Sequence, residues 1–123
     1  MFPINLNQTH WALITVVMHS KTINYYDSLY TISESSNNKM ILISYLLDSY
    51  FEYNKFTENL KKKWIYNFVQ CNKQENGYDC GVFVCKFMDY ISRGQQITFS
   101  QKDMKYFRIL IAGELFSEKI FSK

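Results

Sequence analysis

Residues 10–27, HWALITVVMHSKTINYYD, are the stretch of sequence that decides the fold. The first part, 10–18, is rich in apolar and β-branched residues and predicts a largely buried strand. The last part, 22–27, predicts a second strand, and the three-residue link between the two is typical of a hairpin. His10 opens one strand and Asp27 closes the next, so an antiparallel hairpin places these two side chains next to each other.

Downstream of the hairpin, the pattern alternates between polar and apolar segments. Residues 31–39 (TISESSNNK) predict a polar loop, and residues 40–53 carry apolar side chains near helical spacing and predict a helix. Residues 54–63 are polar and leave their structure open. Residues 64–70 (WIYNFVQ) alternate, contain aromatic residues and predict another strand.

The last third of the chain predicts two helices. Residues 81–92 (GVFVCKFMDYIS) are apolar on most sides, which is typical of a buried helix, although periodicity alone leaves a strand open. Ser100 and Asp103 have the spacing of a capping box, and the helix that follows is expected to run to about Phe121. Strands packed against helices predict an α+β fold, and we expect residues 1–123 to form a single domain.

The composition indicates a packed globular chain and gives no sign of a nucleic-acid or membrane partner. Apolar residues make up 47% of the 123 residues and aromatic residues 18%, which argues against disorder. The net charge of +3 is mild, and no basic stripe alternates with aromatic residues, so no nucleic-acid partner is indicated. No apolar run approaches the roughly 18 residues needed to cross a membrane, so no membrane partner is indicated either.

The cysteine count points to a chemical use of thiols rather than to disulfides. The chain has an odd number of cysteines, Cys71, Cys80 and Cys85, without a CxxC pair, and its first residues do not resemble a secretory signal. We therefore expect a reducing intracellular setting. Structural zinc sites use close-spaced ligand pairs, and none is present here, so we expect no metal or other cofactor. Cys71 and Cys85 are expected to be inert structural thiols.

Cys80 is the candidate nucleophile. The stretch 74–81 (QENGYDCG) places it at the start of the predicted apolar helix, where unpaired backbone N–H groups favour a negatively charged thiolate. Asp79 is expected to cap this helix through its side chain, and Gly81 lets a substrate backbone approach. Cysteine is also a common buried apolar residue, so the pattern alone leaves a core role for Cys80 open.

A catalytic thiol needs a base, and the chain has two histidines. The base must contact the nucleophile through one ring nitrogen and needs an orienting partner on the other. The hairpin gives His10 such a partner in Asp27, whereas His19 falls in the turn at the opposite end, where we expect it to be exposed. A purely structural role for His10 stays open on the pattern alone.

These residues together resemble one family, the ubiquitin-like-protein-specific cysteine proteases, and in particular its SUMO (sentrin)-specific branch. Their order along the chain, His, Asp, Gln and Cys, is the order of that family. The resemblance extends over nearly the whole chain from about residue 2, and its most specific feature is the element that contains Cys80. It rests on His10-Trp11, Asp27-Ser28, Gln74-x-Asn76-Gly77-x-Asp79-Cys80-Gly81, and Asp89-Tyr90-Ile91-Ser92 with Ile97-Thr98-Phe99.

The resemblance implies a fold, an activity and a role for each site residue. The fold is the papain-like cysteine protease type (adenain-like), with a mixed sheet packed by helices. The activity is that of a thiol peptidase or isopeptidase that cleaves after the Gly-Gly terminus of SUMO, in maturation, deconjugation or both. Cys80 would attack the carbonyl carbon, His10 would take the thiol proton and Asp27 would hold the imidazole. Gln74 would donate to the oxyanion, and Trp11 would wall the tunnel over the Gly-Gly strand; the pattern alone also fits Trp11 as a core aromatic residue.

The chain departs from the family pattern in two places. In the family the catalytic histidine lies near the middle of the domain, whereas here it is residue 10. We therefore expect this chain to lack the N-terminal lobe, which supplies the opposite tryptophan and much of the grip on the modifier. Exposed apolar surface, with limited solubility or a partner that covers the gap, is the expected consequence. Asn72-Lys73 replaces a frequent Pro-Gln, which changes the loop before Gln74 but not the role of Gln74.

Two other functions fit the same sequence. One is an inactive remnant that only binds a ubiquitin-like protein or another partner. The other is a protease of the same fold that acts on ubiquitin or another ubiquitin-like modifier. The family suggests the nucleus as the location, with the cytoplasm as the alternative.

Overall fold

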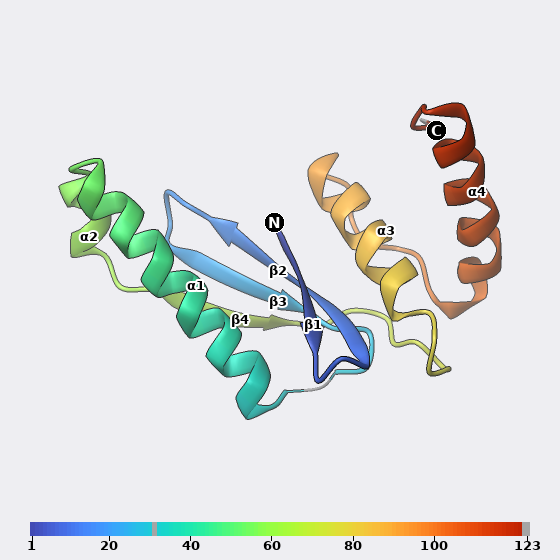
Figure 1. Ribbon diagram of the computed structural model, residues 1–123, viewed down its shortest axis with the longest axis horizontal. Coiled ribbons are helices and arrows are strands. Elements are labelled where there is room, and N and C mark those ends of the chain that lie inside the picture. Colours follow the sequence, from blue (N-terminus) through green and yellow to red (C-terminus); the bar gives the residue numbers. More distant parts are fainter. Residues whose placement is uncertain (31, 122–123) are drawn as a thin grey trace.

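The computed structural model describes residues 1–30 and 32–121 and shows a mixed sheet with helices on both faces (Figure 1). The strands are β1 (Phe2–Leu6), β2 (His10–Val17), β3 (Thr22–Tyr26) and β4 (Ile65–Val69). The helices are α1 (Glu34–Tyr53), α2 (Thr57–Lys61), α3 (Cys80–Ser92) and α4 (Met104–Ser117), with a 3-10 turn η1 (Gln101–Asp103) directly before α4. The predicted α+β class is confirmed.

The strand order in the sheet is β1-β2-β3-β4. The predicted β2–β3 hairpin is confirmed as an antiparallel pair in which Leu13 lies opposite Tyr26. The strand predicted at 64–70 is β4, which runs parallel to β3 and makes the sheet mixed. β1 was not predicted; it pairs with β2 across a turn in which Asn7 and Gln8 have left-handed φ angles of 52° and 61°. Such a turn matches the natural twist of a hairpin, so a short strand suffices.

The side chains of the sheet alternate between two apolar layers, as the two-residue period of a strand requires. On one face, Ile14 and Ile23 pack with Met40 of α1. On the other face, Leu13 packs with Phe83 of α3, and residues that lead into and form α4 extend this second cluster. Figure 1 shows α1 on one side of the sheet and α3 on the other, with α4 beyond α3. The start of α3 is therefore held against the hairpin that carries His10.

α1 begins earlier than the sequence predicted. The prediction of a polar loop at 31–39 is wrong from Glu34 onward, because α1 starts at that residue. Thr31 lies outside the described residues. Ser33 is the N-cap, and its side chain and that of Ser36 form a reciprocal capping box. A capping box satisfies the free N–H groups of the first turn, so a polar segment without an apolar stripe can still be helical.

The two C-terminal helices largely follow the prediction. The apolar segment predicted at 81–92 is helical, which removes the strand alternative. The capping box of Ser100 and Asp103 is present and opens η1, from which α4 continues. α4 ends at Ser117 rather than near residue 121, since Glu118 adopts a left-handed conformation with a φ angle of 55° that stops the helix.

Both outer helices expose large apolar side chains, as expected. They include Ile41, Leu42, Tyr45 and Leu46 on α1, and Ile109, Leu115 and Phe116 on α4. Within residues 1–30 and 32–121, no helix has the length and apolar character that a membrane crossing needs.

Candidate active site

The centre of the site is a buried pair of His10 and Asp27. His10 opens β2 and Asp27 follows the last residue of β3, so the hairpin brings both side chains to the same end of the sheet. His10 Nε2 lies 2.7 Å from Asp27 Oδ1. The same carboxylate oxygen accepts the backbone N–H of Leu29 at 2.8 Å, and Tyr25 donates its hydroxyl to Asp27 Oδ2 at 2.8 Å. The predicted juxtaposition of His10 and Asp27 is therefore confirmed.

The two members of this pair shift each other's pKa. The hydrogen bond that His10 donates to Asp27 raises the pKa of His10 above its ordinary value; burial opposes this rise, and the Cys80 thiol adds to it. Burial alone would raise the pKa of Asp27, but the hydrogen bonds from His10, Leu29 and Tyr25 outweigh it, so the pKa of Asp27 is lowered. Asp27 therefore stays a carboxylate that fixes the imidazole through Nε2.

Cys80 lies beside the other nitrogen of this imidazole. It is the first residue of α3, it is buried, and its thiol is close enough to the imidazole to raise the pKa of His10. In the part of the chain that the structure describes, His10 Nδ1 is buried without a hydrogen-bond partner of its own. A nitrogen that faces a thiol and is otherwise unused is placed to accept the thiol proton. The structure thus brings Cys80, His10 and Asp27 together.

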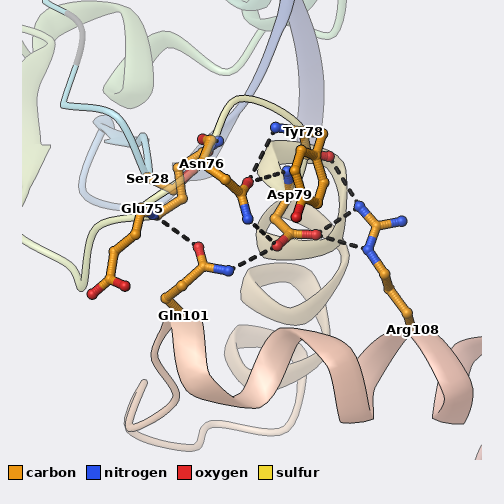
Figure 2. A network of polar contacts seen from close by, with 8 residues as sticks. Ser28, Glu75, Asn76, Tyr78, Asp79, Gln101 and Arg108 are labelled. Carbon is orange, nitrogen blue, oxygen red and sulfur yellow. Dashed lines mark hydrogen bonds and ion pairs between the residues drawn. The ribbon is translucent and has the colours of Figure 1, made fainter.

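Asp79 does not cap α3, which corrects the sequence prediction. No side-chain cap hydrogen bond is formed at this helix start, because the Asp79 carboxylate accepts instead from Asn76, Gln101 and Arg108 (Figure 2). The first turn of α3 therefore has no side-chain cap, and the N-terminal end of the helix favours negative charge at Cys80.

Gln74 is buried and joined to the residue that follows Asp27. Its Oε1 accepts the hydroxyl of Ser28, and its backbone N–H donates to the Ser28 carbonyl at 2.8 Å. Its Nε2 donates one hydrogen to the carbonyl of Asn76. An amide nitrogen has two hydrogens, so one donor remains for an oxyanion. The role of Gln74 as oxyanion donor stays a prediction. Its side chain is held by Ser28 and Asn76, and its backbone by Ser28.

An open groove of about 530 Å³ leads to Cys80. Trp11 lines it and is 44% exposed, so the alternative of a core aromatic residue is wrong. Gly81 lies at the base of the groove, where an added Cβ would be 4.0 Å from Trp11 Cδ1. The opposite wall comes from α4 and includes Arg108 and Leu115. A substrate strand could thus approach the thiol between the indole and α4.

The other two cysteines and the second histidine are not part of the group formed by Cys80, His10 and Asp27. All three cysteines are free, with Cys71 half-buried and Cys85 exposed along the same groove. Burial raises the pKa of Cys71, which disfavours its thiolate. His19 is exposed in the hairpin turn, as predicted. Among residues 1–30 and 32–121, no three His, Cys, Asp or Glu side chains gather as metal ligands.

Sequence reasoning missed the residues that support the site. Tyr25 could have been found, because positions 25 and 27 share one face of a strand with a period of two. Gln101 and Arg108 could not, since both reach Asp79 from a segment more than 20 residues away in the chain.

Comparison with known proteins gives a consistent result. The profile of the Ulp1 protease family, C-terminal catalytic domain, matches residues 1–120. Ubiquitin-like-specific protease 1 of Saccharomyces cerevisiae is 40% identical over 111 residues, which are 89% of this chain and 17% of that protein. Human sentrin-specific protease 2 is 32% identical over 127 residues, which are 98% of this chain and 20% of that protein.

Solved structures agree in fold. The C-terminal Ulp1 protease domain, solved in complex with Smt3, the yeast ortholog of SUMO, is 36% identical with a TM-score of 0.74. The match covers 94% of this chain and 51% of that one. A SUMO protease Ulp1 with its catalytic cysteine oxidised to a sulfonic acid matches with a TM-score of 0.75 at 35% identity, over 94% of this chain and 51% of that one. The chain thus spans about half of the solved domains and from 17% to 33% of the curated relatives.

Proposed function

The chain belongs to the Ulp1 protease family, and on this premise we propose that it forms the thiol-peptidase centre of a SUMO-specific protease. The substrate is SUMO, as a precursor or as a conjugate, and the bond cleaved follows its Gly-Gly terminus. The relatives support this substrate class, since they include sentrin-specific proteases and a Ulp1 domain in complex with Smt3.

In the proposed reaction, an acyl transfer, each residue of the site has one role. The Cys80 sulfur attacks the carbonyl carbon of the terminal glycine while His10 Nδ1 takes the thiol proton. The negative charge that develops on the carbonyl oxygen is stabilised by the backbone N–H groups at the start of α3 and by the free amide hydrogen of Gln74; one such donor contributes roughly 3 kcal/mol. His10 then protonates the leaving amine, and a thioester to Cys80 remains. Water, deprotonated by His10, hydrolyses the thioester and restores the thiol.

One observation carries this proposal. His10 is buried and bound through Nε2 to Asp27 at 2.7 Å, its Nδ1 has no other partner among the described residues, and the Cys80 thiol at the start of α3 is close enough to raise its pKa. A histidine that only supported the core would satisfy both ring nitrogens or leave one in solvent, because a buried polar atom without a partner is destabilising.

An activity-based probe tests the proposal directly. The chain is incubated with SUMO ending in a Gly-Gly vinyl sulfone and, in parallel, with the same probe on ubiquitin. We expect a covalent adduct with SUMO that is absent in Cys80→Ser and retained in Cys85→Ser. Cys85 is the matched control, because it is an exposed thiol on the same helix and along the same groove.

The outcomes separate the alternative functions. An adduct with ubiquitin instead of SUMO would reassign the substrate within the same chemistry. A folded chain that reacts with neither probe, but still binds SUMO in a titration, would identify an inactive binding protein and refute the peptidase. An adduct retained in Cys80→Ser would refute the assigned nucleophile.

We also propose an intracellular location, with the nucleus as the compartment that the family resemblance favours. The three free thiols support a reducing environment. The apolar side chains exposed on α1 and α4 support a partner that covers them when the chain acts. A fluorescent fusion imaged with a nuclear marker tests the location, and exclusion from the nucleus would refute it.

A further inference from the structure

The Asp79 carboxylate, next to the nucleophile, accepts hydrogen bonds from three side chains. Asp79 is only 4% exposed. Its Oδ2 accepts from Asn76 Nδ2 at 2.7 Å and from Gln101 Nε2 at 2.8 Å, and its Oδ1 accepts from Arg108 Nε at 2.7 Å. Burial alone would raise the pKa of Asp79, but these contacts outweigh it, so the pKa is lowered and the group stays charged. Figure 2 shows the carboxylate at the centre of the network.

Two of these partners also hold the backbone of the loop that leads to Asp79. Gln101 accepts the N–H of Glu75 on its Oε1 at 2.9 Å, and Arg108 donates to the Tyr78 carbonyl at 3.0 Å. Gln101 lies in η1 and Arg108 in α4, so one continuous segment holds the loop near both of its ends.

The third partner tightens the loop from within. Asn76 Oδ1 accepts the backbone N–H groups of Tyr78 at 3.1 Å and of Asp79 at 3.0 Å. The Asn76 carbonyl in turn accepts from the side chain of Gln74. A continuous chain of hydrogen bonds therefore joins α4 to Gln74, across a loop that has no regular secondary structure of its own.

We propose that Asp79, clamped by Arg108 and Gln101, is a positioning residue that sets the geometry of the oxyanion-binding loop between Gln74 and Cys80. This inference rests on the proposed peptidase function, because it assigns the clamp to the transition state of that reaction. Buried, charge-assisted hydrogen bonds have narrow distance limits, so α4 fixes the loop against small displacements. A displacement of about 1 Å near a reacting centre can reduce the rate about 100-fold.

The clamp acts on one part of the reaction. Loss of the clamp moves the oxyanion donors but leaves the His10–Asp27 pair in the hairpin intact. Acyl transfer should therefore slow by about 10- to 100-fold in kcat, with little change in KM where the replaced residue does not line the groove. Alkylation of Cys80 by iodoacetamide needs the thiolate and its histidine but no oxyanion donor, so its rate and pH profile should be retained.

The test uses Arg108→Met and Gln101→Leu, with cleavage of a SUMO–aminomethylcoumarin substrate and iodoacetamide alkylation as readouts. Arg108 is 47% exposed at its side chain, so its replacement does not empty the core. Arg93→Met is the matched control, because Arg93 grips Asp89 on α3 through two hydrogen bonds at 3.0 Å, outside this loop. Arg108→Lys, which keeps the charge but loses the two-pronged donor geometry, should restore part of kcat.

Hydrogen exchange of the backbone amides in residues 74–80 tests the clamp independently of turnover. Exchange there should rise about tenfold or more in both variants and stay unchanged in Arg93→Met. If the unmodified chain cleaves no substrate, the proposed function fails, and the exchange result still decides the clamp. Unchanged exchange in both variants would overturn the inference. So would a rise in KM at constant kcat in Gln101→Leu, because Gln101 contacts Asp79 and is not among the residues that line the groove.

Discussion

Removing one oxygen atom, in Tyr25→Phe, tests how the carboxylate of the site is held. The Tyr25 hydroxyl donates to Asp27 Oδ2 at 2.8 Å, and both residues are buried. The ring itself packs edge-on against Phe68 with centroids 5.6 Å apart, and this contact is kept by phenylalanine. The substitution therefore deletes the hydrogen bond to the buried Asp27 carboxylate, together with the contact between the Tyr25 hydroxyl and the side chain of Ser36.

The size of the effect follows from the acceptor. A hydrogen bond to a charged group contributes about 1.5–3 kcal/mol to the free energy of unfolding, and a buried acceptor belongs at the upper end. With the dependence on urea that is usual for small domains, this corresponds to a fall of about 1 to 2 M in the midpoint. Tyr26→Phe is the control, because its hydroxyl interacts with the neutral side chain of Thr15 and should contribute about 1 kcal/mol.

Urea unfolding, followed by tryptophan fluorescence at several pH values, measures the difference. The pKa of Asp27 is lowered in the folded chain, so its stabilisation is complete above the ordinary value of 3.8 and is lost as the pH falls through the lower folded value. The penalty of Tyr25→Phe should be full at pH 7 and shrink below about pH 4. Equal penalties for Tyr25→Phe and Tyr26→Phe at pH 7 would refute the reasoning.

Three further predictions concern stability. His10→Gln should lower the urea midpoint more at pH 6 than at pH 9. The pKa of His10 is raised in the folded chain, so the stabilisation by His10 is present below about pH 6.5 and is lost as the pH rises through the folded pKa. Equal losses at both pH values would contradict this reasoning. Ser33→Ala removes the N-cap of α1 and should cost about 1 kcal/mol in urea unfolding, and no loss would exclude a stabilising cap. Lys21 is 2% exposed, and its Nζ lies 2.8 Å from Asp48 Oδ1. Asp48→Asn removes the ion-pair partner of this buried side chain and should destabilise by about 2 kcal/mol more than Lys21→Met; the reverse order would show that the ion pair does not offset the cost of burying Lys21.

Much of the site could be predicted because its main contacts are local. The hairpin of residues 10–27 has a short link, so the strand pattern alone places His10 beside Asp27. A polar turn followed by an apolar segment likewise fixes Cys80 at a helix start. The hairpin depends on the alternation of its strands across a short link, and the helix start depends on the residues directly around Cys80, so local backbone geometry leaves few alternatives for either feature.

The sequence by itself determined the hairpin, the helix start at Cys80, the capping box at Ser100 and the resemblance to a protease family. Only the tertiary structure decided that β4 lies parallel to β3, that Trp11 faces an open groove, and that Asp79 serves α4 instead of capping α3. The physical reason is that a carboxylate can be satisfied by any nearby donor. Which donor is near depends on how segments more than 20 residues apart pack, and no local period encodes that distance.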